Sequence, residues 1–280
     1  MMFRNILFPT DGSEYSKTAL EYGIYLAKRL DARLTGLHVI DIKVLQGPVL
    51  NDICSAASLS PGPEFFSVIE KALETRADNI LREFRERCEK EGLKPELKKT
   101  MGIIDEEIIR EGQGADLILL AQRGEHYPLS RSVLLGSTAE AVVRKSGKPV
   151  LVTPVSFAEI ESMGLAYDGS PPADHALKIA VELSDKVQWP LTVLIVTDNA
   201  KFSADLSKKV EAALEDYSID SDIIVLGGKE EKEIIKFIEE GAVELLLMGT
   251  HGHSRFKELF LGSTTSHVIR KSRIPVLVTR

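Results

Sequence analysis

The stretch "GSTAEAVVRKSGKPVLVTP" at residues 136–154 returns at the end of the chain as "GSTTSHVIRKSRIPVLVTR" at residues 262–280. Both versions keep a Gly-Ser-Thr start, a basic middle and a Pro-Val-Leu-Val-Thr ending, so the likeness extends over the whole segment. Similarity of this length within one chain indicates that a structural unit has been repeated. Three more pairs of segments recur in the same order, beginning at residues 6 and 164, 36 and 193, and 105 and 231.

The repeat divides the chain into two tandem copies. The second copy starts at Met163, after "PVSFAEIES" at residues 154–162, where a strand ending in proline gives way to a short polar stretch. A length of 280 residues also favours two domains of ordinary size. The sequence therefore predicts one domain at residues 1–155 and a second at residues 163–280.

Short apolar runs alternate with amphipathic segments within each copy. The runs are too short for helices and lack a clean polar alternation, as expected of parallel strands buried on both faces. This order of elements predicts a doubly wound α/β fold, in which ligands bind at the carboxyl ends of the strands. In the first copy the predicted strands include residues 6–8, 34–40, 117–121 and 150–152, and the predicted helices include residues 13–30 and 138–145.

The composition disfavours two classes of partner. With 35 basic and 42 acidic residues the chain has a net charge of −7, which repels a polyanion such as nucleic acid. Cys54 and Cys88 form no paired motif, and the first residues lack a long apolar signal region. No apolar run approaches the roughly 18 residues that a membrane helix needs. We therefore expect a soluble, cytoplasmic protein that binds neither nucleic acid nor a membrane.

A glycine-rich stretch in the second copy follows one predicted strand and precedes a helix. Gly249 ends the strand, Gly252 lies in the loop, and Gly262, Ser263 and Thr264 open the helix. Free backbone N–H groups and the helix dipole favour an anion such as phosphate there, and the hydroxyl groups add donors. The same residues could instead be turn glycines and a helix cap without a ligand, and one copy alone leaves the two interpretations about even.

An Asp-Gly-Ser sequence follows the first predicted strand of each copy, as "TDGS" at residues 10–13 and "YDGS" at residues 167–170. The carboxylates of Asp11 and Asp168 could accept hydrogen bonds from a ligand amine or a ribose hydroxyl. Asp-Gly is also a common turn dipeptide, and Asp can cap a helix. The ligand-binding interpretation gains weight because each Asp and its glycine-rich loop should lie at the same end of one sheet.

The spacing Gly249, two residues, Gly252, nine residues, Gly262-Ser263, with an Asp after the first strand, resembles the nucleotide-binding motif of universal stress proteins. The resemblance covers the whole chain as two copies, and the second copy keeps the pattern without departure. It implies an adenine nucleotide ligand, with Asp168 at the adenosine and Val196 meeting adenine through its backbone. The nucleotide-binding residues that it implies in this copy are Asp168, Gly169, Val196, Met248, Gly249, His251, Gly252, Arg255, Gly262, Ser263 and Thr264.

The resemblance also implies an architecture. Each domain would be a Rossmann-like, adenine nucleotide alpha hydrolase-like unit with a five-stranded parallel sheet flanked by helices. Family members resemble dimers whose last strands pair across a two-fold axis. Here residues 149–153 and 275–279 would form that pair within one chain as an intramolecular pseudo-dimer, with further homo-oligomers left open.

The first copy departs from the motif. Ala121 replaces the first glycine, and eleven residues, 125–135, separate Gly124 from Gly136 instead of nine. We expect this copy to bind nucleotide less tightly or differently, or to have lost binding, because the longer loop must bulge where phosphates would lie. It also carries an insertion at residues 43–64, either a lid or partner-binding loop or a plain surface excursion. The residues implied in this copy are Asp11, Val39, Gly124, Gly136, Ser137 and Thr138.

Three functions are compatible with these features. The leading hypothesis is a regulatory stress-response module that binds ATP, ADP or AMP with little or no turnover, since no residues are obviously arranged for catalysis. A slow ATPase, with Mg²⁺ bridging the phosphates, is the second. The third is an interaction protein with vestigial pockets. We assign no catalytic residues and no protein metal site, because no Cys or carboxylate completes a ligand set around His251 and His253.

Overall fold

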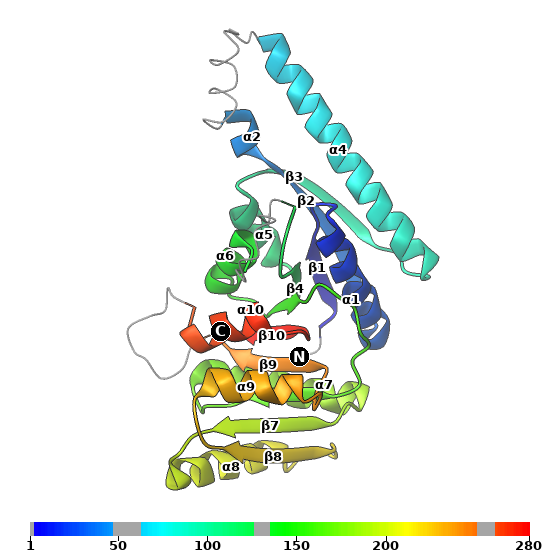
Figure 1. Cartoon of the computed structure of the whole chain (residues 1–280). Coiled ribbons are helices and arrows are strands. Elements are labelled where there is room, and N and C mark those ends of the chain that lie inside the picture. Colours follow the sequence, from blue (N-terminus) through cyan, green and yellow to red (C-terminus); the bar gives the residue numbers. More distant parts are fainter. Residues whose placement is uncertain (1–2, 47–62, 126–134, 251–260) are drawn as a thin grey trace.

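The computed structural model describes residues 3–46, 63–125, 135–250 and 261–280 of the α/β chain. Ten strands form one sheet in the order β3-β2-β1-β4-β5-β10-β9-β6-β7-β8 (Figure 1). The five strands of each half run parallel, whereas β5 and β10 pair antiparallel at the centre. The predicted pair of doubly wound parallel sheets is confirmed, and so is the pairing of the last strands.

Strands and helices alternate in both halves, with the same strand order in each. The first half contains β1 (Asn5–Pro9), α1 (Glu14–Leu30), β2 (Arg33–Asp41), α2 (Ile42–Gln46), α4 (Pro63–Lys90), β3 (Glu96–Gly102), α5 (Ile104–Gly112), β4 (Leu117–Ala121), α6 (Ser137–Lys145) and β5 (Val150–Thr153). The second half contains β6 (Met163–Ala166), α7 (Pro171–Val187), β7 (Leu191–Val196), α8 (Ala200–Leu214), β8 (Ser221–Leu226), α9 (Glu230–Glu239), β9 (Leu245–Gly249), α10 (Ser263–Lys271) and β10 (Val276–Thr279).

The central strands are apolar because helices cover both of their faces. Every residue of β5 and β10 is buried, and in β4 and β9 only the last residue is partly exposed. Val276 of β10 pairs with Val152 of β5, and Leu277 pairs with Leu151. The apolar core therefore continues from one half into the other. No residue of the edge strands β3 and β8 is fully buried; β3 has a polar sequence, whereas β8 ends in the apolar run 223–226, and the sequence predicted neither strand individually.

The segment between the halves, residues 154–162, which the sequence suggested was a short polar stretch, packs against the core. The Tyr22 hydroxyl donates to the Ser156 carbonyl at 3.0 Å, and the Tyr25 hydroxyl donates to the Ile160 carbonyl at 2.6 Å. Ile160 is fully buried. Two tyrosines of α1 therefore fasten this connection to the first half.

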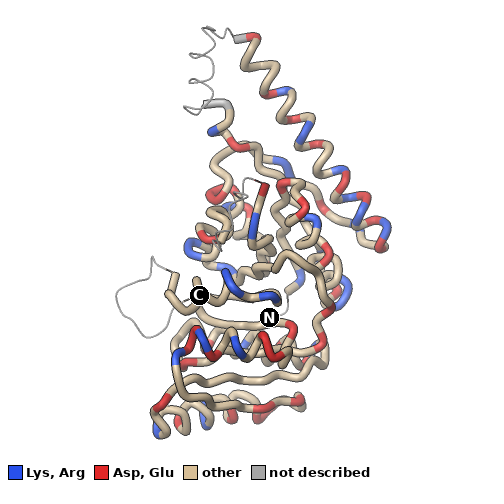
Figure 2. Tube along the Cα trace, viewed as in Figure 1, with Lys and Arg blue, Asp and Glu red and all other residues tan. Residues whose placement is uncertain are grey.

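Helices α4 and α8 occupy equivalent places but differ in length. A Cβ atom at Gly12 would lie 2.9 Å from Ile80 of α4, and one at Gly169 would lie 2.5 Å from Leu206 of α8, so Ile80 and Leu206 are counterparts. By this register the extra length of α4 is residues 63–73, which extend beyond the sheet (Figure 1). The predicted insertion at residues 43–64 was thus too short, although its residues 47–62 lie outside the described part of the chain. Acidic and basic residues alternate along most of α4 (Figure 2).

Candidate functional site

A cavity of about 700 Å³ lies in the first half at the carboxyl ends of β1, β2 and β4. This is the edge at which doubly wound sheets bind ligands, and the volume is in the range of small-molecule sites. Loop, strand and helix residues far apart in the sequence meet here. All six residues that the sequence singled out in this half line the cavity: Asp11, Val39, Gly124, Gly136, Ser137 and Thr138.

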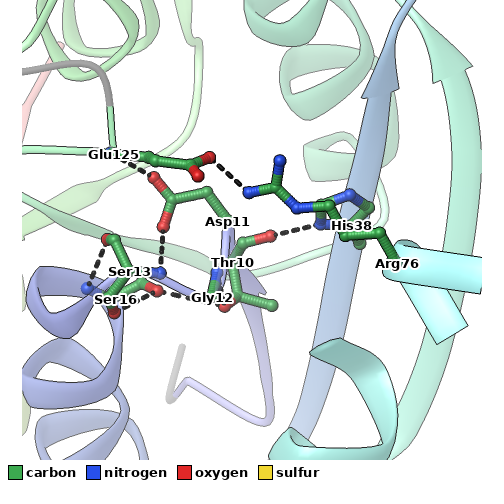
Figure 3. A network of polar contacts seen from close by, with 8 residues as sticks. All are labelled: Thr10, Asp11, Gly12, Ser13, Ser16, His38, Arg76 and Glu125. Carbon is green, nitrogen blue, oxygen red and sulfur yellow. Dashed lines mark hydrogen bonds and ion pairs between the residues drawn. The ribbon is translucent and has the colours of Figure 1, made fainter. Parts of the chain in front are cut away.

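The Asp11 carboxylate joins two loops of the cavity wall. One oxygen accepts from the Ser13 backbone N–H at 2.9 Å, and the other accepts from the Glu125 backbone N–H at 2.7 Å (Figure 3). Burial alone would raise the pKa of Asp11, but the hydrogen bonds from Ser13 and Glu125 outweigh it and lower the pKa below the ordinary value. Asp11 is therefore ionised at neutral pH and fixed in place.

The N-terminus of α6 faces the same cavity. Its cap residue is Gly136, and no side chain caps the first turn. Ser137 and Thr138 open the helix and line the cavity. The positive end of the helix dipole and the hydroxyl groups of these residues suit an anionic group.

The loops before α6 and α10 are closed by equivalent hydrogen bonds. In the first half the Gly136 N–H donates to the Gln122 carbonyl at 3.0 Å, and in the second half the Gly262 N–H donates to the Thr250 carbonyl at 2.8 Å. Both helices lack a side-chain cap. The two extra residues of the first loop are therefore confined to the segment between these bonds.

The second half gathers its described candidate residues at the matching edge. Asp168 and Gly169 follow β6, Val196 ends β7, and Met248 and Gly249 end β9. These strands are neighbours in the sheet, and Asp168 accepts from the Ser170 N–H at 2.9 Å, as Asp11 does from Ser13. Gly262, Ser263 and Thr264 open α10. The predicted residues His251, Gly252 and Arg255 lie outside the described residues.

Gly249 has a packing role that the sequence did not reveal. A Cβ atom there would lie 2.9 Å from Pro172 Cβ and 3.0 Å from the Ala173 nitrogen, in the first turn of α7. A side chain at this position would therefore push β9 and α7 apart. The first half has Ala121 at this place. The absence of a side chain at Gly249 is explained without a ligand.

Two residues in the wall of the first cavity were missed by the sequence analysis. The His38 Nδ1 lies 2.8 Å from the Thr10 carbonyl, which can only accept, so Nδ1 carries the hydrogen (Figure 3). Arg76 of α4 pairs with Glu125 at 2.5 Å. Burial lowers the pKa of His38, and Arg76 lowers it further, against the Thr10 hydrogen bond and the charges of Asp11 and Glu125. His38 is therefore neutral at pH 7.

Only one of these residues carried a usable sequence signal. His38 interrupts an otherwise apolar strand in "GLHVID", and a buried polar residue near a strand end can indicate a site. Arg76 is one of many charged residues on α4 and becomes distinctive only through its position over the cavity. The second half has Ile195 in place of His38. The alignment of Ile80 in α4 with Leu206 in α8 makes Phe202 the residue equivalent to Arg76.

No helix within the described residues is long and apolar enough to cross a membrane.

Comparison with known proteins gives one family over most of the chain. The universal stress protein family matches residues 2–154 and 199–280. Universal stress protein Slr1230 of Synechocystis is 30% identical over 290 residues, covering 99% of this chain and all of the relative. Universal stress protein MJ0577 of Methanocaldococcus jannaschii is 32% identical over 157 residues, covering 54% of this chain and 95% of that protein.

A solved structure agrees over the full length. The crystal structure of a universal stress protein from Archaeoglobus fulgidus has a TM-score of 0.78 and 26% identity, covering all of this chain and 97% of that one. The family match, the full-length relative and the shared fold lead to one conclusion. The chain belongs to the universal stress protein family.

Proposed function

We propose that the protein is an adenine-nucleotide-binding universal stress protein that works by holding ATP, ADP or AMP, with little or no turnover. The observation that carries the proposal is the first-half cavity, whose wall contains all six residues implied by the motif. Two halves, with domains at residues 1–155 and 163–280, would each present one such site. The longer loop of the first half predicts weaker binding there, although the cavity provides room for a ligand.

The residues of the cavity suggest how a nucleotide would be held. Asp11, kept ionised by its hydrogen bonds, can accept from a ribose hydroxyl or an amine. The backbone of Val39, two residues before the end of β2, would meet the adenine edge. Gly136, Ser137 and Thr138 would surround the phosphates at the positive end of α6. With ATP, Mg²⁺ would arrive bound to the phosphates and supply charge neutralisation.

We base retention rather than hydrolysis on the sequence, in which no residues are obviously arranged for catalysis. The Asp11 carboxylate is oriented by the Ser13 and Glu125 backbone N–H groups. The neutral His38 ring carries its hydrogen on Nδ1, which faces the Thr10 carbonyl, and its acceptor atom is Nε2. We therefore propose regulation through bound nucleotide as the function.

The test is to denature purified protein, identify any released nucleotide by mass spectrometry, and count it per chain. We expect an adenine nucleotide, with about one per chain if only the second half retains it. Titration of stripped ¹⁵N-labelled protein with ATP, AMP and adenosine then assigns the sites, because the Gly136 and Gly262 amides report on equivalent loop bases. No released nucleotide and no amide shift in either half would contradict the proposal and favour an interaction protein.

A further inference from the structure

We propose that Arg76 is a specificity-determining residue of the first-half site, which selects ligands carrying a phosphate, and that Glu125 is an internal anion the phosphate replaces. The inference rests on the proposed nucleotide function and adds the source of its selectivity. Arg76 comes from α4 and Glu125 follows β4, so neither belongs to the glycine-rich motif.

The ion pair crosses the opening of the site. Helix α4 packs against β2, Glu125 follows β4, and β1 lies between β2 and β4 in the sheet. Arg76 and Glu125 therefore meet above the carboxyl end of β1, where Asp11 is located (Figure 3). Both side chains also line the cavity. A ligand bound at Asp11 would therefore lie beside this pair.

A ligand phosphate can replace the Glu125 carboxylate at Arg76 with little loss of free energy. The side chains of Arg76 and Glu125 are 48% and 40% exposed, so Glu125 can return to water without leaving a buried charge. A guanidinium binds a phosphate through paired N–H groups at least as well as it binds a carboxylate. A neutral nucleoside offers no group to replace Glu125. Arg76 would therefore discriminate by charge.

Another cation in the cavity wall, Lys145, is less suited to this role. The Lys145 ammonium is paired at 2.6 Å with Asp105, whose side chain is only 19% exposed and cannot swing freely into water. Asp11 is held by two backbone N–H groups. In the second half the counterpart of Arg76 is Phe202, which has no charge. Charge selection by this device is thus confined to the first half.

The experiment is a titration of stripped ¹⁵N-labelled full chain with ATP, AMP and adenosine, followed at the Gly136 amide. We expect Arg76→Gln to weaken ATP and AMP binding by about tenfold and to leave adenosine unchanged, because one charge-assisted hydrogen-bonded contact is lost. Glu125→Gln should tighten ATP and AMP binding by about threefold to fivefold, the range of a half-exposed ion pair. In the Arg76→Gln background, Glu125→Gln should have no further effect.

Arg82 and Glu86 provide the matched control. They form an exposed pair on the same helix at 3.8 Å and do not line the cavity, so Arg82→Gln and Glu86→Gln should leave the titration unchanged. The Gly262 amide should respond alike in all variants. An equal loss of affinity for ATP and for adenosine in Arg76→Gln would overturn the role of Arg76, and so would weaker ATP binding in Glu125→Gln. Neither result would contradict the proposed nucleotide function. A wild-type Gly136 amide that ignores every nucleotide would overturn both.

Discussion

The two halves of the chain share a framework and differ in the side chains placed around it. The same hydrogen bonds close the loops at Gly136 and Gly262, and both helices begin without a side-chain cap. At the rim of the site, however, the first half has His38 and Arg76 where the second has Ile195 and Phe202. The backbone bonds that set the loop geometry are shared by the two halves, while the side chains at these rim positions differ. One backbone framework can therefore carry edges of different polarity.

The largest effect is expected from Gly249→Val, which tests whether the glycine difference between the halves is structural. The new side chain would collide with Pro172 and with the backbone at Ala173, so we expect a loss of about 3 kcal/mol in the free energy of unfolding. Urea denaturation measures it. The matched control is Ala121→Val at the first-half position, where the existing Cβ shows that a side chain is tolerated and a smaller loss should follow. Equal losses at both positions would refute the packing explanation.

The second-largest effect is a loss of adenosine affinity when the aspartate of either half is replaced, and it allows the two candidate sites to be measured separately. Asp168→Ala should weaken adenosine binding in the second half by about 1.5 to 3 kcal/mol if it accepts a buried ligand hydrogen bond. Asp11→Ala should do the same in the first half, and it should also lower stability by about 1 to 2 kcal/mol because the Glu125 N–H loses its acceptor. The Gly136 and Gly262 amides assign each affinity to its half.

Each variant serves as the control for the other. Loss of binding should stay within the half that carries the substitution. Unchanged affinity in both variants would return Asp11 and Asp168 to the role of turn residues, whose bonds to Ser13 and Ser170 are local.

The sequence predicted the repeated fold and the edge of the sheet at which the candidate residues gather. This worked because buried parallel strands such as β4 and β5 are continuous apolar runs and the repeat supplied each element twice. The edge strand β3 escaped notice because its exposure lets it be polar, whereas β8 was overlooked although residues 223–226 form an apolar run. The role of Gly249 escaped because its contact with Pro172 joins segments distant in sequence.

For a related reason, the sequence could not show that Phe202 occupies the position in the second half that Arg76 occupies in the first. Helices α4 and α8 differ in length and have little sequence in common, so their register had no anchor until Ile80 and Leu206 were found above equivalent glycines. Which residue of each helix lies at the rim of the site depends on that register. Side-chain chemistry at the rim of the site is thus the part of this protein that required three-dimensional information.

The smallest effect concerns His38 and the pH dependence of stability. Burial lowers the pKa of His38 in the folded chain, so acidification favours the unfolded state, in which the imidazole protonates freely. This destabilisation is absent well above about pH 6.5, the ordinary value, and grows as the pH falls toward the lowered pKa of the folded chain. The charged groups that face His38 are Asp11, Arg76 and Glu125, and histidine is the side chain whose ordinary pKa lies in this range.

His38→Ile gives the first half the residue that the second half already has at Ile195. The variant should therefore lose less stability than the wild type between about pH 7 and pH 5, as measured by urea denaturation at each pH. Parallel losses in the two proteins would show that the ring protonates as easily in the folded chain as in the unfolded one. In that case His38 would add polarity to the first site without making its half sensitive to acid, and the difference from Ile195 would concern ligand contact alone.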